Sequence, residues 1–263
     1  MVTEDKWDNK GQYTKKRIML YEQIFGKGYI SPGGHRMTEQ MCLTLQNLKK
    51  DARVLDIGSG TGGPAFFFES QYDCSLTGVD LCGDISTMAT ERAATRGSKV
   101  NFICGDILNM DFASKSFDVI MSRDTLLHLS ETKKRELFAK CIQWLDDNGE
   151  IVIGDYCRRP RGEEICESFK AYIIDRGYDL HEPLAYGKLL EDAGFKQVEA
   201  KDVSIEFLEM LENELERFRN NSHQLSENFA KDDYDSIEKS WLAKIEWVRS
   251  GDMRKGILFG RQG

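Results

Sequence analysis

A glycine-rich turn after a short apolar run is the stretch of this sequence best suited to hold a ligand. The run from Val54 to Ile57 is followed by four glycines within the six residues Gly58 to Gly63. This pattern predicts a buried strand, a tight turn and the start of a helix. Glycine permits positive φ and lets backbone N–H groups approach a ligand closely. Because a helix N-terminus favours negative charge, the turn predicts a ligand with an anionic group.

Two carboxylates are expected at the same edge of the sheet as this turn. Asp80 ends an expected strand over residues 75–79, and Asp106 follows another over residues 100–104. In an open α/β sheet the ligand lies outside the carboxyl ends of the strands. Asp80 can then accept hydrogen bonds from the hydroxyls of a ribose, and Asp106 from an adenine amino group.

The glycine spacing alone leaves two classes of enzyme open. Gly58, Gly60 and Gly63 also satisfy G-x-G-x-x-G, and Asp80 lies twenty residues after Gly60, as in dinucleotide-binding sites. A nicotinamide oxidoreductase therefore remains an alternative at this point, and donor-binding calorimetry would separate it from a nucleoside-binding transferase.

Strands and helices alternate after the glycine turn, which predicts a parallel sheet with helices on both faces. Asp84 is the possible cap of one helix, and Gly97 and Gly194 are expected helix stops. The expected strands span residues 54–57, 75–79, 100–104, 117–121, 150–154, 195–202 and 256–260. The expected helices span residues 14–25, 36–48, 84–96, 132–145, 183–192, 204–220 and 234–248, with further helical spacing inside an insertion at 157–180.

A single domain is expected over residues 1–263. Residues 1–50 are expected to form N-terminal helices and a lid, 51–155 the ligand-binding core, and 156–263 a substrate-side insertion and C-terminal part. The net charge of −8 argues against a general nucleic-acid binder, which usually shows a basic surface. No stretch approaches the roughly 18 apolar residues of a membrane span.

The cysteines and histidines suggest neither disulfides nor a metal site. Seven cysteines occur without a Cys-x-x-Cys pair, so no disulfide framework is indicated and a reducing cytoplasm is the expected setting. No metal is expected, because the four histidines, His35, His128, His181 and His223, form no ligand pattern. A monomer is expected.

Three ordered motifs resemble the nucleoside-contacting motifs of class I S-adenosylmethionine-dependent methyltransferases. They are Val-Leu-Asp-Ile-Gly-Ser-Gly from Val54, Gly-Val-Asp-Leu ending at Leu81, and Gly-Asp-Ile ending at Ile107. The resemblance covers about residues 50–155 and favours a methyltransferase over a dehydrogenase. It implies a Rossmann-like fold with a seven-stranded, mostly parallel sheet, helices on both faces and S-adenosylmethionine bound across the switch point.

Further segments are similar to the phosphoethanolamine N-methyltransferases, in particular to the compact single-domain form of malaria parasites. They are Gln12-Tyr13-Thr14, the stretch from Tyr21 to Gly26, the stretch from Tyr29 to Gly34, Ser122-Arg-Asp124, His128 and Gly154-Asp-Tyr-Cys157. This resemblance implies S-adenosylmethionine-dependent methylation of phosphoethanolamine, or of its mono- and dimethyl forms, toward phosphocholine for phosphatidylcholine synthesis.

The resemblance also implies roles for individual residues. Tyr13 and His128 are similar to the family's catalytic dyad. The acceptor-side positions are Tyr13, Asp124, Tyr156, Arg176, Tyr178 and Lys244. The donor-side positions are Tyr21, Ile30, Ser31, Asp56, Gly58, Gly60, Asp80, Leu81, Asp106, Ile107 and Arg123.

The proposed chemistry requires a base, because the acceptor nitrogen arrives as an ammonium without a lone pair. An imidazole has a pKa near 6.5, which suits general-base catalysis by His128 at neutral pH, with Tyr13 closing the site. Two alternatives remain: a methyltransferase acting on another amine or a sterol, and a non-catalytic donor-binding protein. The sequence does not specify which of the three methyl transfers occur.

Overall fold

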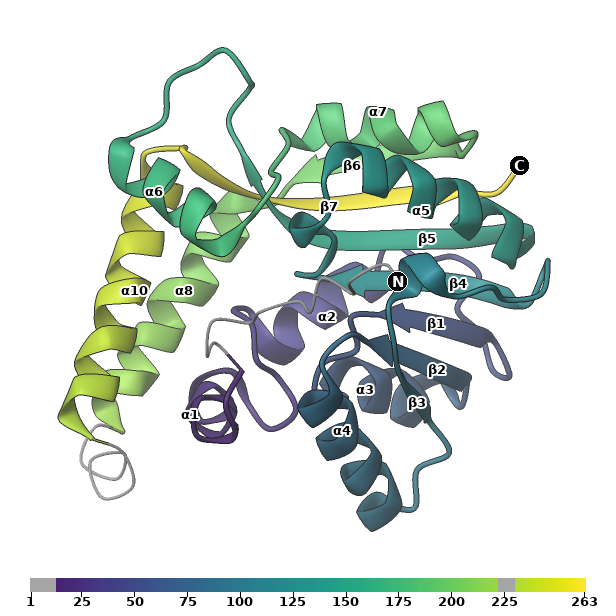
Figure 1. Cartoon of the computed structure of the whole chain (residues 1–263), viewed down its shortest axis with the longest axis horizontal. Helices are drawn as coiled ribbons and strands as arrows, with labels where there is room; N and C mark the ends of the chain where they lie inside the picture. Colours follow the sequence, from purple (N-terminus) through teal and green to yellow (C-terminus); the bar gives the residue numbers. More distant parts are fainter. Residues whose placement is uncertain (1–12, 222–229) are drawn as a thin grey trace, which may run out of the picture.

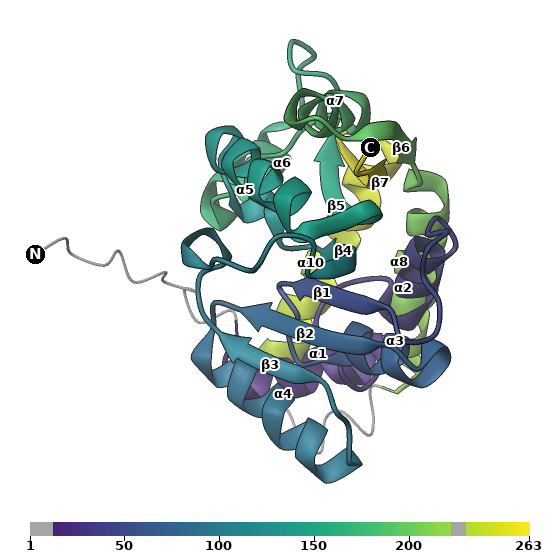
Figure 2. The ribbon, with the colours of Figure 1, turned by 90° about the vertical axis from the view of Figure 1, so that its right-hand side faces the viewer.

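The computed structural model describes residues 13–221 and 230–263, which form one sheet with helices on both faces (Figure 1). The strands are β1 (Arg53–Ile57), β2 (Ser75–Asp80), β3 (Asn101–Cys104), β4 (Phe117–Arg123), β5 (Leu145–Arg158), β6 (Lys196–Asp202) and β7 (Met253–Arg261). Their order is β3-β2-β1-β4-β5-β7-β6, as Figure 2 shows. Only β7, among these strands, runs antiparallel to its neighbours, which confirms the expected mostly parallel sheet.

The helices follow the expected alternation with the strands. They are α1 (Lys15–Phe25), α2 (Gly34–Cys42), α3 (Gly63–Tyr72), α4 (Gly83–Arg96), α5 (Glu131–Trp144), α6 (Glu167–Arg176), α7 (Pro183–Ala193), α8 (Ser204–Asn220) and α10 (Lys231–Arg249). Gly97 and Gly194 adopt positive φ directly after α4 and α7, as expected of helix stops. No helix in the described part of the chain is long and apolar enough to cross a membrane.

Alternate residues of the central strands fill two separate cores. Val54 of β1 and Val152 of β5 belong to the core beneath α2, α3 and α8. The neighbouring Leu55 and Ile151 belong to the core beneath α5 and α7. Because successive strand residues point to opposite faces, these apolar runs bury both sides of the sheet and hold its strand ends rigidly.

Two local expectations were wrong. The helix expected to reach Leu48 ends at Cys42, because the backbone N–H groups of Gln46 and Asn47 both donate to the buried Glu150 carboxylate at 2.8 Å instead of extending the helix. Asp84 does not cap α4: Cys82 occupies the cap position, and Asp84 lies in the first helical turn.

The N-terminal helix α1 is fixed to two other parts of the molecule. It packs against α8, beside α10 (Figure 1). Lys16 Nζ lies 2.5 Å from a carboxylate oxygen of Asp233 on α10. Glu22 receives two hydrogen bonds from Arg92 on α4, at 2.5 and 2.8 Å. Helix α1 therefore bridges the sheet side of the molecule and its C-terminal helices.

Candidate active site

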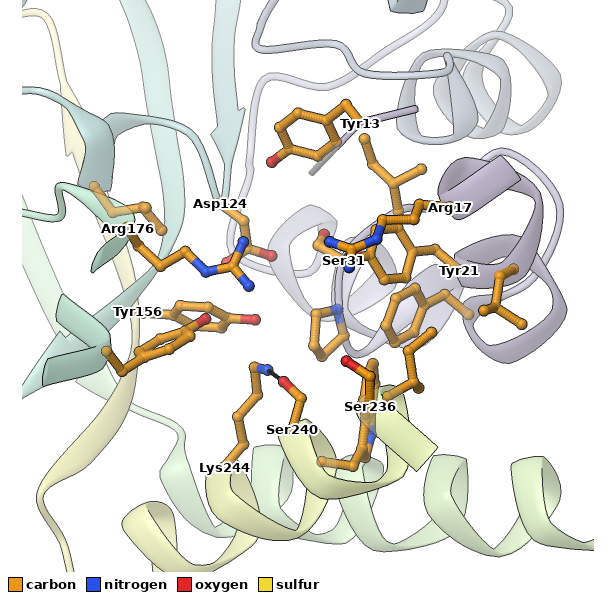
Figure 3. A pocket seen from close by; sticks show the side chains of 18 of the residues that line it. Tyr13, Arg17, Tyr21, Ser31, Asp124, Tyr156, Arg176, Ser236, Ser240 and Lys244 are labelled. Atoms are coloured by element: carbon orange, nitrogen blue, oxygen red, sulfur yellow. Dashed lines mark hydrogen bonds between the residues drawn. The ribbon is translucent and has the colours of Figure 1, made fainter. Parts of the chain in front are cut away.

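Two adjoining cavities lie at the carboxyl ends of the central strands. The larger has a volume of about 1170 Å³ and is lined by the glycine turn and the ends of β2, β3 and β4. The smaller has a volume of about 160 Å³ and is lined mainly by α1, α6 and α10 (Figure 3). The residues common to both walls are Tyr13, Ile30, Ser31 and Asp124.

The glycine turn forms the floor of the larger cavity. Gly58 has φ +77°, and a Cβ atom there would lie 1.9 Å from Thr125 Oγ1, so only glycine fits. The Gly60 N–H donates to Asp80 Oδ2 at 2.9 Å, while the Cys82 N–H donates to Asp80 Oδ1 at 2.9 Å. Asp80 is therefore fixed against the turn, and burial raises its pKa.

Nine of the eleven expected donor-side residues line the larger cavity. They are Ile30, Ser31, Gly58, Gly60, Asp80, Leu81, Asp106, Ile107 and Arg123. Tyr21 lines the smaller cavity instead, and Asp56 lines neither. Asp56 is 1% exposed within β1, where burial raises its pKa to about 7. Its carboxylate is buried away from both cavities, and one of its oxygens has no hydrogen-bond partner in the described residues.

Arg123, at the end of β4, holds the N-terminal loop in place. Its Nη1 donates to the Gly34 carbonyl at 2.7 Å, and its Nη2 donates to the carbonyls of Pro32 at 2.7 Å and Ser31 at 3.1 Å. Because a guanidinium offers five donors in a fixed plane, one buried side chain orders the whole loop. Arg123 thereby sets the position of Ser31, which lies on the wall of both cavities.

All six expected acceptor-side residues line the smaller cavity. Arg176 and Lys244 approach it from α6 and α10, and Figure 3 shows both cationic groups directed inward. Lys244 is 6% exposed, and its Nζ donates to Ser240 Oγ at 2.8 Å. Burial, and then the positive charge of Arg176, lower the pKa of Lys244 to about 7.

His128 lies where the two cavities meet. It lines the larger cavity, and its ring lies edge-on to that of Tyr178, which lines the smaller one, at 4.9 Å between centroids. Burial, and then Arg176, lower the pKa of His128 to about 4, well below the ordinary value expected from the sequence. The imidazole is therefore neutral at physiological pH. Tyr13 reaches both cavities, and burial raises its pKa, so its phenol keeps its proton.

Lys255 and Arg17 are among the residues at the site that the sequence reasoning missed. Lys255 of β7 is fully buried and donates to Asp124 Oδ1, which fixes a carboxylate on the wall of both cavities. Arg17 of α1 lines the smaller cavity. The lysine interrupts the apolar strand Met253–Arg261, which could have indicated a buried ion pair. Arg17 had no sequence signal beyond lying four residues after Tyr13.

No metal site accompanies these cavities in the described residues, where no group of three or more His, Cys, Asp or Glu side chains could hold an ion. The arrangement supplies a large cavity with fixed carboxylates, a small cationic cavity rich in tyrosine, and a neutral imidazole beside both.

Comparison with known proteins agrees with this geometry. Residues 54–149 match a methyltransferase domain family. Phosphoethanolamine N-methyltransferase 1 of Triticum aestivum is 41% identical over 97% of this chain, which covers 51% of that protein. The chain thus spans about half the length of the plant relatives it matches.

The enzyme from Plasmodium falciparum, named phosphoethanolamine N-methyltransferase, is 36% identical over 89% of this chain and 87% of its own length. A solved structure of Haemonchus contortus phosphoethanolamine N-methyltransferase 2, in complex with phosphomonomethylethanolamine and S-adenosylhomocysteine, has a TM-score of 0.91. It is 28% identical, and the match covers 96% of this chain and 58% of that one. The chain therefore belongs to the phosphoethanolamine N-methyltransferase family.

Proposed function

We propose that this protein transfers methyl groups from S-adenosylmethionine to the nitrogen of phosphoethanolamine, of its methylated forms, or of both. The observation that supports this proposal best is the small cavity lined by Arg176, Lys244 and five tyrosines, which adjoins the larger cavity lined by the glycine turn and His128. The nematode relative that binds a phosphorylated monomethyl amine and S-adenosylhomocysteine supports the same substrates here. In this proposal the protein acts as a monomer, and its role is to supply phosphocholine for the synthesis of phosphatidylcholine. A cytoplasmic setting accords with seven free cysteines.

The larger cavity offers groups that suit the donor. Asp80 and Asp106 offer carboxylate oxygens near the positions expected for a ribose and an adenine, and Leu81 and Ile107 add apolar surface. When bound, S-adenosylmethionine supplies a sulfonium-activated methyl group. The glycine turn gives the methionine portion room to approach the backbone.

Replacing Asp80 tests this placement of the donor. Asp80→Asn should weaken S-adenosylmethionine binding roughly 10- to 100-fold, since hydrogen bonds to charged groups contribute about 1.5–3 kcal/mol. Titration calorimetry with the donor measures the change. Asp84→Asn is the matched control, because Asp84 is exposed in the first turn of α4 and lines neither cavity. Equal donor affinity in Asp80→Asn and wild type would remove Asp80 from the donor site.

The acceptor's phosphate fits the smaller cavity. A phosphomonoester carries between about 1.5 and 2 negative charges near pH 7. Arg176 can pair with its oxygens through two parallel hydrogen bonds, and Lys244 adds a point charge. Tyr156 and Tyr178 keep their protons, since burial raises the pKa of both, and can donate directed hydrogen bonds. This charged wall is unsuited to a sterol.

Acceptor binding should take up a proton above neutral pH. In the substrate-free protein Lys244 loses its proton as pH rises through about 7. A phosphate dianion beside it favours the charged form, so its pKa rises in the complex and binding at pH 8 must protonate it. Affinity should fall above pH 7 for this reason, and below about pH 6 because the phosphate gains a proton.

Calorimetry of phosphoethanolamine binding at pH 8, in two buffers of different ionisation enthalpy, measures that uptake. The uptake should approach one proton in wild type and vanish in Lys244→Met. Lys239→Met, an exposed lysine on the same helix, should behave like wild type. A binding enthalpy independent of the buffer in wild type would contradict the protonation of Lys244.

The chemical step needs one proton to leave the acceptor and one methyl group to arrive. His128 takes the ammonium proton, directly or through water, so that the nitrogen lone pair can attack the methyl carbon in line with the carbon–sulfur bond. The electrons of that bond return to sulfur. Asp124 attracts the cationic amine, and Tyr13 closes the junction against water, which aligns the reactants.

The defining experiment offers labelled S-adenosylmethionine with phosphoethanolamine, its mono- and dimethyl forms, and free ethanolamine in separate reactions. We expect turnover of phosphorylated acceptors alone, and the pattern among them identifies which methyl transfers this chain performs. Donor binding without turnover of any phosphorylated acceptor would refute the proposed substrate and leave a methyltransferase of another small amine.

A further inference from the structure

Arg17 is a third cation on the wall of the smaller cavity. It lies on α1, opposite Arg176 of α6 and above Lys244 of α10, and all three side chains line the same space. Figure 3 shows the guanidinium groups of Arg17 and Arg176 extending into the cavity from opposite walls. A small enclosed space with three cationic groups is suited to an anion with several oxygens.

The two acidic residues on the wall of this cavity, Asp124 and Asp233, already pair with other cations. Asp233 lines this cavity but lies 2.5 Å from Lys16 Nζ. The Asp124 carboxylate accepts from Lys255 on the far side of the wall. Within residues 13–221 and 230–263, the Arg17 guanidinium makes no hydrogen bond or ion pair, although its charge adds to that of Lys16 in lowering the pKa of Asp233. The Nε of Arg176 is buried without a hydrogen bond, and the carboxylate nearest to it is that of the exposed Asp175, at 3.8 Å. The cationic groups around the smaller cavity therefore outnumber the carboxylates that pair with them, and this excess of positive charge points to an anionic ligand.

Arg17 is also coupled to Tyr13 through the start of α1. Thr14 caps this helix: its hydroxyl accepts from the Arg17 N–H at 3.3 Å, and its carbonyl accepts from the Ile18 N–H at 2.9 Å. Tyr13 directly precedes the cap and lines both cavities. One helical turn thus joins a residue over the site junction to a cation in the smaller cavity, and a ligand that holds Arg17 restrains Tyr13.

We infer that Arg17 binds the phosphate of the acceptor, and that this contact holds the first turn of α1, with Tyr13, over the junction of the two cavities. This inference rests on the proposed function, because it takes the acceptor to be a phosphomonoester. The phosphate then has two roles. It anchors the acceptor between Arg176 and Lys244, and it closes the lid above the amine through Arg17.

The kinetic test compares Arg17→Met, which keeps the apolar stem, with Arg17→Lys and wild type. Arg17→Met should raise the acceptor KM roughly 10- to 100-fold, the loss expected for one charge-assisted contact. It should also lower kcat, because Tyr13 is no longer held, while the donor Kd stays unchanged. Arg17→Lys should restore part of the KM. Lys15→Met is the control, since Lys15 is exposed on the same helix and lines neither cavity.

Hydrogen exchange tests the lid directly, with inorganic phosphate and phosphoethanolamine as probes. Both should slow exchange of the amides in residues 15–20 in wild type and in Lys15→Met, but not in Arg17→Met. Wild-type kinetics in Arg17→Met, or undiminished protection of α1 by phosphate in that variant, would overturn the inference. Lys15→Met behaving like Arg17→Met would overturn it too, because general helix weakening would then explain both.

The same measurements separate a failure of the proposed function from a failure of the role given to Arg17. If wild type turns over no phosphorylated acceptor, the proposed function is wrong and the inference falls with it. If wild type turns over phosphoethanolamine and Arg17→Met matches it in KM, kcat and exchange, the function stands and only the role of Arg17 is refuted.

Discussion

His128→Ala is expected to lower kcat by about 10²- to 10⁴-fold, the usual contribution of a positioned general base, with S-adenosylmethionine affinity near that of wild type. The geometry motivates this expectation. The imidazole lies at the meeting point of the two cavities, edge-on to Tyr178. Removing it leaves the acceptor nitrogen protonated and without a lone pair, whereas the donor-binding glycine turn and Asp80 are untouched.

Single-turnover methyl transfer and donor calorimetry together measure this effect. His35→Ala is the matched control, because the His35 side chain is 54% exposed and the residue lines neither cavity. Turnover within a few-fold of wild type in His128→Ala would remove the general-base role. A large loss of donor affinity would instead assign His128 to donor binding.

The base strength of His128 should depend on the acceptor's phosphate. In the substrate-free protein burial and the charge of Arg176 hold the pKa of His128 at about 4, which makes it neutral but weakly basic. A phosphate dianion between Arg176 and Lys244 offsets that positive charge, so the pKa of His128 should rise in the complex. Imidazole NMR titrations with and without phosphoethanolamine would show the shift, and identical titrations would exclude this coupling.

The wall of the larger cavity could be predicted from the sequence because the signals for it are local. A strand, a glycine turn and carboxylates at the next strand ends occupy fixed places in an open α/β sheet, and nine expected residues line one cavity. Spacing carries no such information for the acceptor side. Tyr13, Asp124, Tyr156, Arg176 and Lys244 come from distant elements, and only the family resemblance brought them together before the structure did.

The end of α2 and the ion-pair partner of Asp124 could not be predicted from the sequence, because both depend on tertiary contacts. The Gln46 and Asn47 N–H groups donate to Glu150, more than a hundred residues away in the sequence. For this reason α2 ends before the residue expected from the sequence. The partner of Asp124 is equally remote: Lys255 reaches it across the sheet from β7. Neither pairing follows a local period, so neither could be inferred from patterns of hydrophobicity or turn residues.

Lys255→Met is expected to lower the free energy of unfolding by about 3–5 kcal/mol, the cost of removing one partner from a buried ion pair. Lys255 is fully buried, and its Nζ donates to Asp124 Oδ1 and, at 3.3 Å, to the Gly154 carbonyl. Its ammonium also lies 4.9 Å from the Tyr156 ring centroid. Without it, the one ion-pair partner left to Asp124 among the described residues is Arg123, whose Nε is 3.6 Å away.

Urea denaturation of the single and double variants separates charge from packing. If the loss comes from an uncompensated Asp124 carboxylate, then Lys255→Met combined with Asp124→Asn should recover much of it, because neither buried charge remains. Asp124→Asn alone should also destabilise, since it leaves the Lys255 ammonium without its partner. Additive losses in the double variant, or a single-variant loss under 1 kcal/mol, would contradict the ion-pair account. Asp124 directly follows β4 with φ +52°, and Lys255 and Arg123 are the two cations that lie within ion-pair distance of its carboxylate in the described residues.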